Sequence, residues 1–116
     1  MTTAPAASWR ERDMSAQGPL GPLRGTLCES GVVGAPLALI HPGSGPTDRH
    51  GDNPLGVAAQ PYRLLAHALA DHGVDTLRVD KRGMHGSAQA GDPNALTLDD
   101  YADDIHAWLD ALKRPR

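Results

Sequence analysis

The sequence predicts an α/β fold with an incomplete, mainly parallel sheet and flanking helices. Strand-like and helix-like segments follow one another in the order strand, strand, helix, strand, helix, which is the alternation typical of parallel sheets. Glycine-rich segments come directly after two of the strands. One strand is a continuous apolar run, as expected for a strand covered on both faces. We expect right-handed crossovers between parallel strands.

The N-terminal residues 1–16 are polar and rich in alanine, without a sustained periodicity. We therefore expect a poorly ordered lead there, followed by one partial α/β domain over residues 17–116. The first strand is predicted over 23–28, where apolar and polar positions alternate. The proline-rich stretch just before it is expected to hold an edge strand or a turn.

The second strand is predicted over 36–41, the continuous apolar run PLALIH. A glycine-rich loop follows up to Gly56, and then a helix whose first turn suits Pro61. Gly73 occupies the position expected of a helix C-cap. The apolar face of this helix is predicted to carry Tyr62, Leu65, Ala66 and Leu69.

The third strand is predicted over 76–80, and a second glycine-rich turn follows it from Lys81 to Gly91. The last helix is predicted to begin at Thr97, because Asp100 three residues later completes a capping-box pattern. It should end near Leu112, before Pro115. The basic residues at its end complement the helix dipole; they are Lys113, Arg114 and Arg116.

Composition and charge exclude several classes of protein. The 116 residues suffice for one small domain or a piece of a larger one. Net charge is −3 without a clustered basic face, so we expect no nucleic-acid partner. The single cysteine and scattered histidines show no zinc-site spacing, and we expect no metal or cofactor. No long apolar run predicts a signal peptide or membrane helix, so we expect a cytoplasmic protein without a membrane partner.

The loop HPGSGPTDR, residues 41–49, is the most informative segment. Gly43 and Gly45 flank Ser44, and glycines can adopt backbone angles that make successive N–H groups converge. Converging N–H groups stabilise a developing negative charge, such as the oxygen of a tetrahedral acyl intermediate. The loop is therefore a candidate oxyanion hole.

Two other interpretations of this loop stay open. A phosphate cradle is disfavoured because no G-K-[ST] follows, the third glycine of GxGxxG is replaced by Asp48, and Pro46 lacks an N–H group. A loop with a purely structural role fits the glycine and proline content equally well.

The loop, followed by Asn53 and Pro54, resembles the oxyanion loop of α/β-hydrolases in the esterase and dienelactone-hydrolase-like branch. The second turn, DKRGMHGS over 80–87, is similar to the family's D-x-R-G-x-G-x-S turn, and the helix 97–112 resembles the one leading to the nucleophile strand. The resemblance implies ester-type hydrolysis by the parent enzyme on a small ester-like substrate. It assigns the oxyanion loop to Gly43, Ser44 and Gly45, and a structural turn to Asp80, Arg82, Gly83 and Gly86.

The sequence departs from this family pattern in three respects. His50 stands where relatives tend to carry an acidic residue, and His85 stands where the turn has a glycine. No G-x-S-x-G nucleophile elbow occurs in the chain. Nothing in the spacing favours an improvised triad of Ser44, His85 and Asp80.

The expectation is therefore the N-terminal half of an α/β-hydrolase fold, ending before the nucleophile strand and not catalytic alone. Without that strand, the strand 36–41 would have an open edge, which favours self-association or a complementing chain. The alternative is a non-catalytic binding or assembly module that pairs through this edge with a second chain. A small nucleotide-binding domain is a third, weaker hypothesis.

Overall fold

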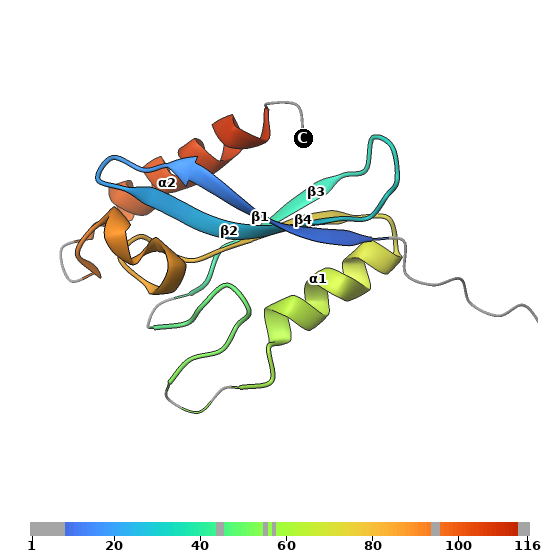
Figure 1. The fold of residues 1–116 in the computed structure, drawn as a ribbon, viewed down its shortest axis with the longest axis horizontal. Coiled ribbons are helices and arrows are strands. Elements are labelled where there is room, and N and C mark those ends of the chain that lie inside the picture. Colours follow the sequence, from blue (N-terminus) through green and yellow to red (C-terminus); the bar gives the residue numbers. More distant parts are fainter. Residues whose placement is uncertain (1–8, 44–45, 55, 57, 94–95, 114–116) are drawn as a thin grey trace, which may run out of the picture.

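The computed structural model describes residues 9–43, 46–54, 56, 58–93 and 96–113. Four strands, two α-helices and one short 3₁₀ helix follow one another along the chain (Figure 1). In order they are β1 (Arg10–Gln17), β2 (Pro22–Glu29), β3 (Leu37–Ile40), α1 (Pro61–Asp71), β4 (Asp75–Val79), η1 (His85–Ala90) and α2 (Leu98–Leu112). α2 ends at Leu112, as predicted, and the residues expected just beyond it, Arg114, Pro115 and Arg116, lie outside the described residues.

The four strands form one mixed sheet in the order β1-β2-β4-β3. β1 pairs antiparallel with β2, and β2 pairs antiparallel with β4, so the prediction of a mainly parallel sheet is wrong. Only β3 and β4 are parallel, and the connection between them contains α1. The physical reason for the first pairing is the short connection, since only four residues join β1 to β2. The Gly18 N–H donates to the Gly21 carbonyl oxygen at 3.1 Å and closes this turn. So short a link permits only an antiparallel hairpin.

β1 is the element that the sequence does not predict, since residues 10–16 were expected to lack regular structure. Its RERDMSAQ sequence carries charges at four of eight positions and shows no apolar alternation. The strand nevertheless pairs with β2 along its whole length, from Arg10 opposite Glu29 to Gln17 opposite Pro22. Ala16 is buried against the core and Met14 is half-buried.

The two α-helices lie on opposite sides of the sheet (Figure 1). α1 begins with Pro61, as predicted, and Gly73 follows its C-cap with a φ of 81°. α2 has the predicted capping box: the Thr97 side chain accepts from the backbone N–H of Asp100, and the Asp100 carboxylate accepts from the N–H of Thr97. No helix among the described residues is both long and apolar enough to cross a membrane.

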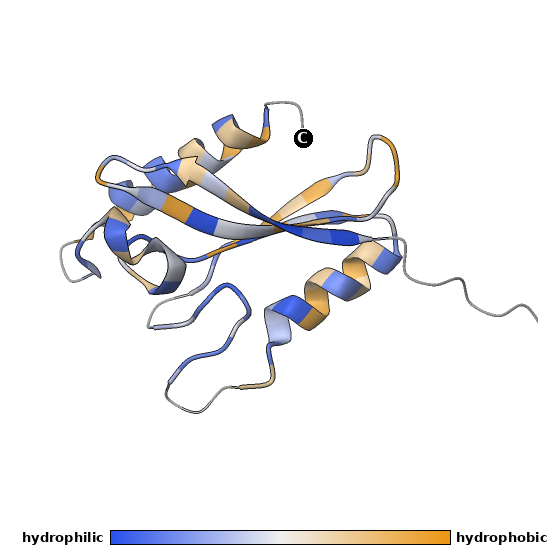
Figure 2. Cartoon of the chain, viewed as in Figure 1, coloured by the Kyte–Doolittle hydropathy of each residue, from blue (hydrophilic) through white to orange (hydrophobic). Residues whose placement is uncertain are grey.

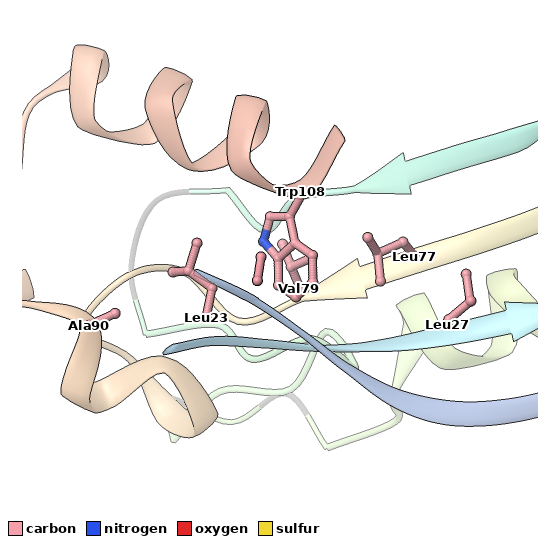
Figure 3. Packing of buried hydrophobic residues seen from close by; sticks show 7 residues of the cluster. Leu23, Leu27, Leu77, Val79, Ala90 and Trp108 are labelled. Atoms are coloured by element: carbon pink, nitrogen blue, oxygen red, sulfur yellow. The ribbon is translucent and has the colours of Figure 1, made fainter. Parts of the chain in front are cut away.

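The hydrophobic core lies between the sheet and α2 (Figure 3). Trp108 of α2 is 1% exposed and packs on Leu23, Leu27, Leu77 and Val79 of the two central strands. A side chain at Gly25 would meet the Trp108 ring at 3.2 Å and the Arg78 carbonyl at 2.7 Å, so this glycine makes room for the indole. One large aromatic ring thus fills a core otherwise made of Leu, Val and Ala.

Two predictions of burial are wrong. β3 is half-buried at all four residues rather than covered on both faces, because it is the outermost strand of the sheet. α1 buries Ala66 and Ala70, whereas Leu65, predicted on its buried face, is 48% exposed. Figure 2 shows apolar positions along α1, two of which, Leu64 and Leu65, are exposed.

Candidate functional site

The candidate site lies where β3 and β4 end. Because these neighbouring strands are parallel, their carboxyl ends meet at the same edge of the sheet. The loop that begins at His41 leaves β3 there, and the turn that begins at Asp80 leaves β4 beside it. Open sheets bind ligands in this position, beyond the carboxyl ends of parallel strands. The two motifs singled out in the sequence therefore become neighbours.

Asp80 holds the two motifs together. The side chain is 2% exposed, and its two oxygens accept three N–H groups. Oδ1 accepts from the backbone N–H of Arg49 at 2.7 Å, and Oδ2 accepts from Arg49 Nε at 3.0 Å and from the backbone N–H of Gly86 at 3.1 Å. Arg49 also donates to Thr26 Oγ1 on β2 at 3.1 Å. One carboxylate thus fastens the first loop, the second turn and the sheet to one another.

Two further contacts join the same segments. Lys81 Nζ donates to the carbonyl oxygen of Gly43 at 2.5 Å, and Lys81 is 3% exposed. Burial lowers the pKa of the Lys81 ammonium from its ordinary value. His85 Nε2 lies 2.8 Å from the carbonyl oxygen of Pro46, and since a carbonyl only accepts, this nitrogen carries the proton. Side chains of the second turn therefore hold carbonyl groups on both sides of Ser44 and Gly45.

Arg82 fastens the second turn to α2. Its guanidinium donates to both oxygens of Asp104, with Nη2 to Oδ1 at 2.7 Å and Nε to Oδ2 at 3.0 Å. Both side chains are almost fully buried. The hydrogen bond and the charge of Asp104 raise the pKa of Arg82 above its ordinary value. This two-point pairing fixes the middle of α2 relative to the strand ends.

Backbone geometry explains the two glycines of this turn. Gly83 has a φ of 80°, and a Cβ there would lie 2.7 Å from the carbonyl oxygen of Gly91. A Cβ at Gly86 would lie 2.8 Å from both Arg49 Nη2 and Asp80 Oδ2. A side chain at Gly86 would therefore push the central ion pair apart. Both residues, like Asp80 and Arg82, have structural roles in this geometry.

A mostly apolar cavity of about 430 Å³ opens between the two motifs and α2. His41, Pro42, Gly43 and Lys81 form its polar side, and the remaining walls come from the second turn and from α2, namely Met84, Pro93, Leu98, Tyr101 and Ile105. The His41 and Tyr101 rings meet edge to face with centroids 5.7 Å apart. Burial lowers the pKa of His41, and its Nδ1 lies 3.1 Å from the Pro42 carbonyl.

The structure brings only part of the predicted site into view. Gly43 lines the cavity, and apart from its chain neighbours no described residue lies within 4 Å of a Cβ built on it. Ser44 and Gly45, the other two residues of the predicted oxyanion loop, lie outside the described residues. The improvised triad gains no support, because the Asp80 carboxylate faces Arg49 and Gly86, and the His85 ring bonds to Pro46.

The sequence does not predict the roles of two buried residues of the site, Lys81 and Ser87. Lys81 is the x of D-x-R-G and has no assigned role in the motif. Ser87 is fully buried, donates to the Asp80 carbonyl at 2.8 Å and accepts from the Arg24 N–H at 2.9 Å, which ties the turn to β2. The serine of the D-x-R-G-x-G-x-S pattern was the available signal for this structural role.

Among the described residues, no three His, Cys, Asp or Glu side chains are grouped so as to hold a metal ion. A scan against protein-family models matches none of them. A search of curated proteins finds no significant match to the chain.

Proposed function

We propose that this chain supplies the oxyanion loop of a cytoplasmic enzyme that hydrolyses a small ester-like substrate. The observation that carries the proposal is the contact between the two sequence motifs. Asp80 accepts from Arg49, Lys81 donates to Gly43, and His85 bonds to Pro46, although 31 to 39 residues separate the partners. The two motifs that resemble α/β-hydrolase loops thus form one rigid unit at the strand ends.

The cavity beside Gly43 has the chemistry that an acyl substrate needs. Its walls are mostly apolar, which suits an acyl chain, and its polar side is formed by residues of the glycine-rich loop. Backbone N–H groups around Gly43, Ser44 and Gly45 would stabilise the developing oxyanion. In such a low-dielectric site, a fixed N–H dipole is worth more than in water.

The antiparallel strand pairings do not affect the proposed role of the glycine-rich loop. The antiparallel pairings involve β1, β2 and β4, whereas both motifs leave the parallel pair β3 and β4. In α/β-hydrolases an oxyanion N–H comes from a loop between the third strand and the first helix. The loop of this chain likewise follows β3 and precedes α1.

The attacking group must come from outside these 116 residues, because they contain no G-x-S-x-G. The isolated chain should therefore release no p-nitrophenol from p-nitrophenyl acetate above the buffer rate. Turnover that is abolished by Ser44→Ala would contradict this division of labour, since it would make Ser44 the nucleophile.

The oxyanion role itself is tested in the longest reading frame that contains this chain. Gly43→Ala keeps the N–H group, and apart from its chain neighbours no described residue lies within 4 Å of the new Cβ. Gly43→Pro removes the N–H group at the same position. We expect kcat for p-nitrophenyl acetate to fall by about 10²-fold or more in the proline variant, with the alanine variant close to wild type. Equal kcat values in the two variants would refute a Gly43 N–H donor.

A second candidate function is assembly through the edge of β3. This strand is the last of the sheet and is half-buried along its length, and Val33 in the loop before it is 99% exposed. An open apolar edge favours pairing with a second copy or a complementing chain. Sedimentation velocity over a wide concentration range should then show a dimer. A monomer at every concentration would contradict assembly and leave the hydrolase proposal untouched.

A further inference from the structure

A second cavity lies between the sheet and the start of α1 and is also lined by residues of the first loop. It has a volume of about 490 Å³ and is mainly polar. Its walls come from β1, β2, β4, the first loop and the start of α1. The charged and ring-bearing residues around it are four arginines, two carboxylates and one histidine, namely Arg12, Arg49, Arg63, Arg78, Glu11, Asp13 and His50. Four arginines around one cavity are unusual in a chain whose net charge is −3.

Arg78 is the most deeply buried of these residues. It lies in the middle of β4 and is 1% exposed, yet the only carboxylate it pairs with among the described residues is Glu11, at 2.6 Å. Its Nε atom is buried and has no hydrogen-bond partner in the described part of the chain. An unpaired donor on a buried charged group is costly. The hydrogen bonds of this guanidinium are therefore incomplete.

Glu11 does not fully neutralise the charge of Arg78, because its carboxylate also lies close to a second side chain. Its Oε2 lies 3.1 Å from His67 Nε2 on α1. Burial raises the pKa of Glu11, but Arg78 and, to a smaller extent, His67 lower it, and the pKa is lowered overall. Glu11 thus pairs with Arg78 and lies within ion-pair distance of His67, whose Nε2 makes no hydrogen bond among the described residues.

His50 and Arg63 add further donors to the same cavity. The Nδ1 atom of His50 is buried and lacks a partner among the described residues. Burial is the largest cause that lowers the pKa of His50; the charges of Arg78 and Arg49 act in the same direction, and those of Asp48 and Asp80 oppose them. Arg63 bonds to Gln60 at 2.8 Å and makes no ion pair within the described ranges.

We propose that this cavity binds a small ligand through a carboxylate or phosphate group, held by Arg78, Arg63 and the His50 ring. The planar guanidinium fork matches the oxygens of either group. The cavity volume falls within the range of roughly 300–1,000 Å³ that is usual for small-molecule sites. The ligand would join β4, the first loop and the start of α1, and would complete the hydrogen bonds that these side chains lack.

This inference stands apart from the proposed hydrolase function. The cavity at the strand ends and the cavity beside Arg78 share no lining residue. Loss of one function therefore leaves the other testable in the same preparation.

The test measures thermal unfolding of the chain with sodium phosphate, sodium succinate or sodium chloride at matched ionic strength. We expect phosphate, succinate or both to raise Tm in a saturable way that chloride does not reproduce. A stronger response to phosphate would identify a phosphoryl ligand, and a stronger response to succinate a carboxylate. Equal effects of all three salts would overturn the proposal, because they would show charge screening alone.

Variants locate the binding. Arg63→Gln removes an exposed donor at the cavity, and Arg10→Gln removes the same charge from an exposed position on β1 outside it. We expect Arg63→Gln to weaken anion binding by about tenfold, and Arg10→Gln to leave it unchanged. His50→Asn should also weaken it, and the side-chain N–H signal of Arg78 should shift on titration with the binding anion. Equal weakening by the Arg10 and Arg63 variants, or an unmoved Arg78 signal, would refute the site.

Discussion

Asp80→Asn provides the sharpest perturbation of the candidate site, because it changes charge and hydrogen bonding with little change of shape. The two Asp80 oxygens accept three N–H groups, two of them from Arg49 and one from Gly86. An asparagine offers one oxygen and an NH₂ group, so at least one of these donors would face another donor. Arg49, whose side chain is 18% exposed, would also lose its close carboxylate partner.

Breaking a buried ion pair by removing one partner costs about 3–5 kcal/mol. Arg49 remains partly hydrated, so we expect a loss near the lower limit, about 3 kcal/mol of the free energy of unfolding. For a chain of this size, that corresponds to a fall in Tm of roughly 10 °C. Urea unfolding followed by circular dichroism measures it, provided that the m-value stays constant.

Asp13→Asn is the matched control, because Asp13 also approaches Arg49, at 3.6 Å, but its side chain is 90% exposed. Its loss should cost about 0.5 kcal/mol or less. In a double-mutant cycle, Arg49→Met should cost less in the Asp80→Asn background than in wild type. Equal destabilisation by the two aspartate variants, or additive effects of the Arg49 and Asp80 changes, would refute the role given to Asp80.

Four further predictions concern single side chains. Thr97→Ala should lower the free energy of unfolding by about 1 kcal/mol, measured by urea unfolding, because it removes the cap of α2. Arg82→Lys should cost about 2 kcal/mol in the same assay, since lysine cannot make the two-point contact to Asp104. Burial raises the pKa of Cys28 from 9.0 to about 11, so the native thiol should resist iodoacetamide at neutral pH and stability should decline as the pH rises from 9 towards 11. Burial lowers the pKa of His41 in the folded chain. The stability that neutral His41 contributes is therefore present above pH 6.5 and is lost as the pH falls through the folded-state pKa of His41. A pH series of urea unfolding experiments should show less acid sensitivity in His41→Asn.

Local signals in the sequence predict several elements well. The bounds of α2 follow from its capping box, and Pro61 marks the start of α1. β2 and β4 are found within one residue at each end, because their strand signals are local.

Contacts between distant residues decide what the sequence does not predict. One charge of β1, on Glu11, meets Arg78, which is 67 residues away in the chain. Because this contact has no local signal in the sequence, the hairpin of β1 and β2 is not predicted. Its antiparallel pairing is one reason that the sheet is mixed rather than mainly parallel. The motifs of the candidate site are recognisable in the sequence, but the bonds that join them, such as Lys81 to Gly43, appear only in three dimensions.

Asp80 holds the two glycine-rich segments against each other, and amide hydrogen exchange tests this directly. The backbone N–H groups of Arg49 and Gly86 both donate to the buried Asp80 carboxylate. They should exchange far more slowly than unstructured amides in the native chain, and should lose this protection in Asp80→Asn while amides of β2 such as Leu27 keep theirs. Exchange of the Arg49 and Gly86 amides at unprotected rates in the wild-type chain would contradict the account.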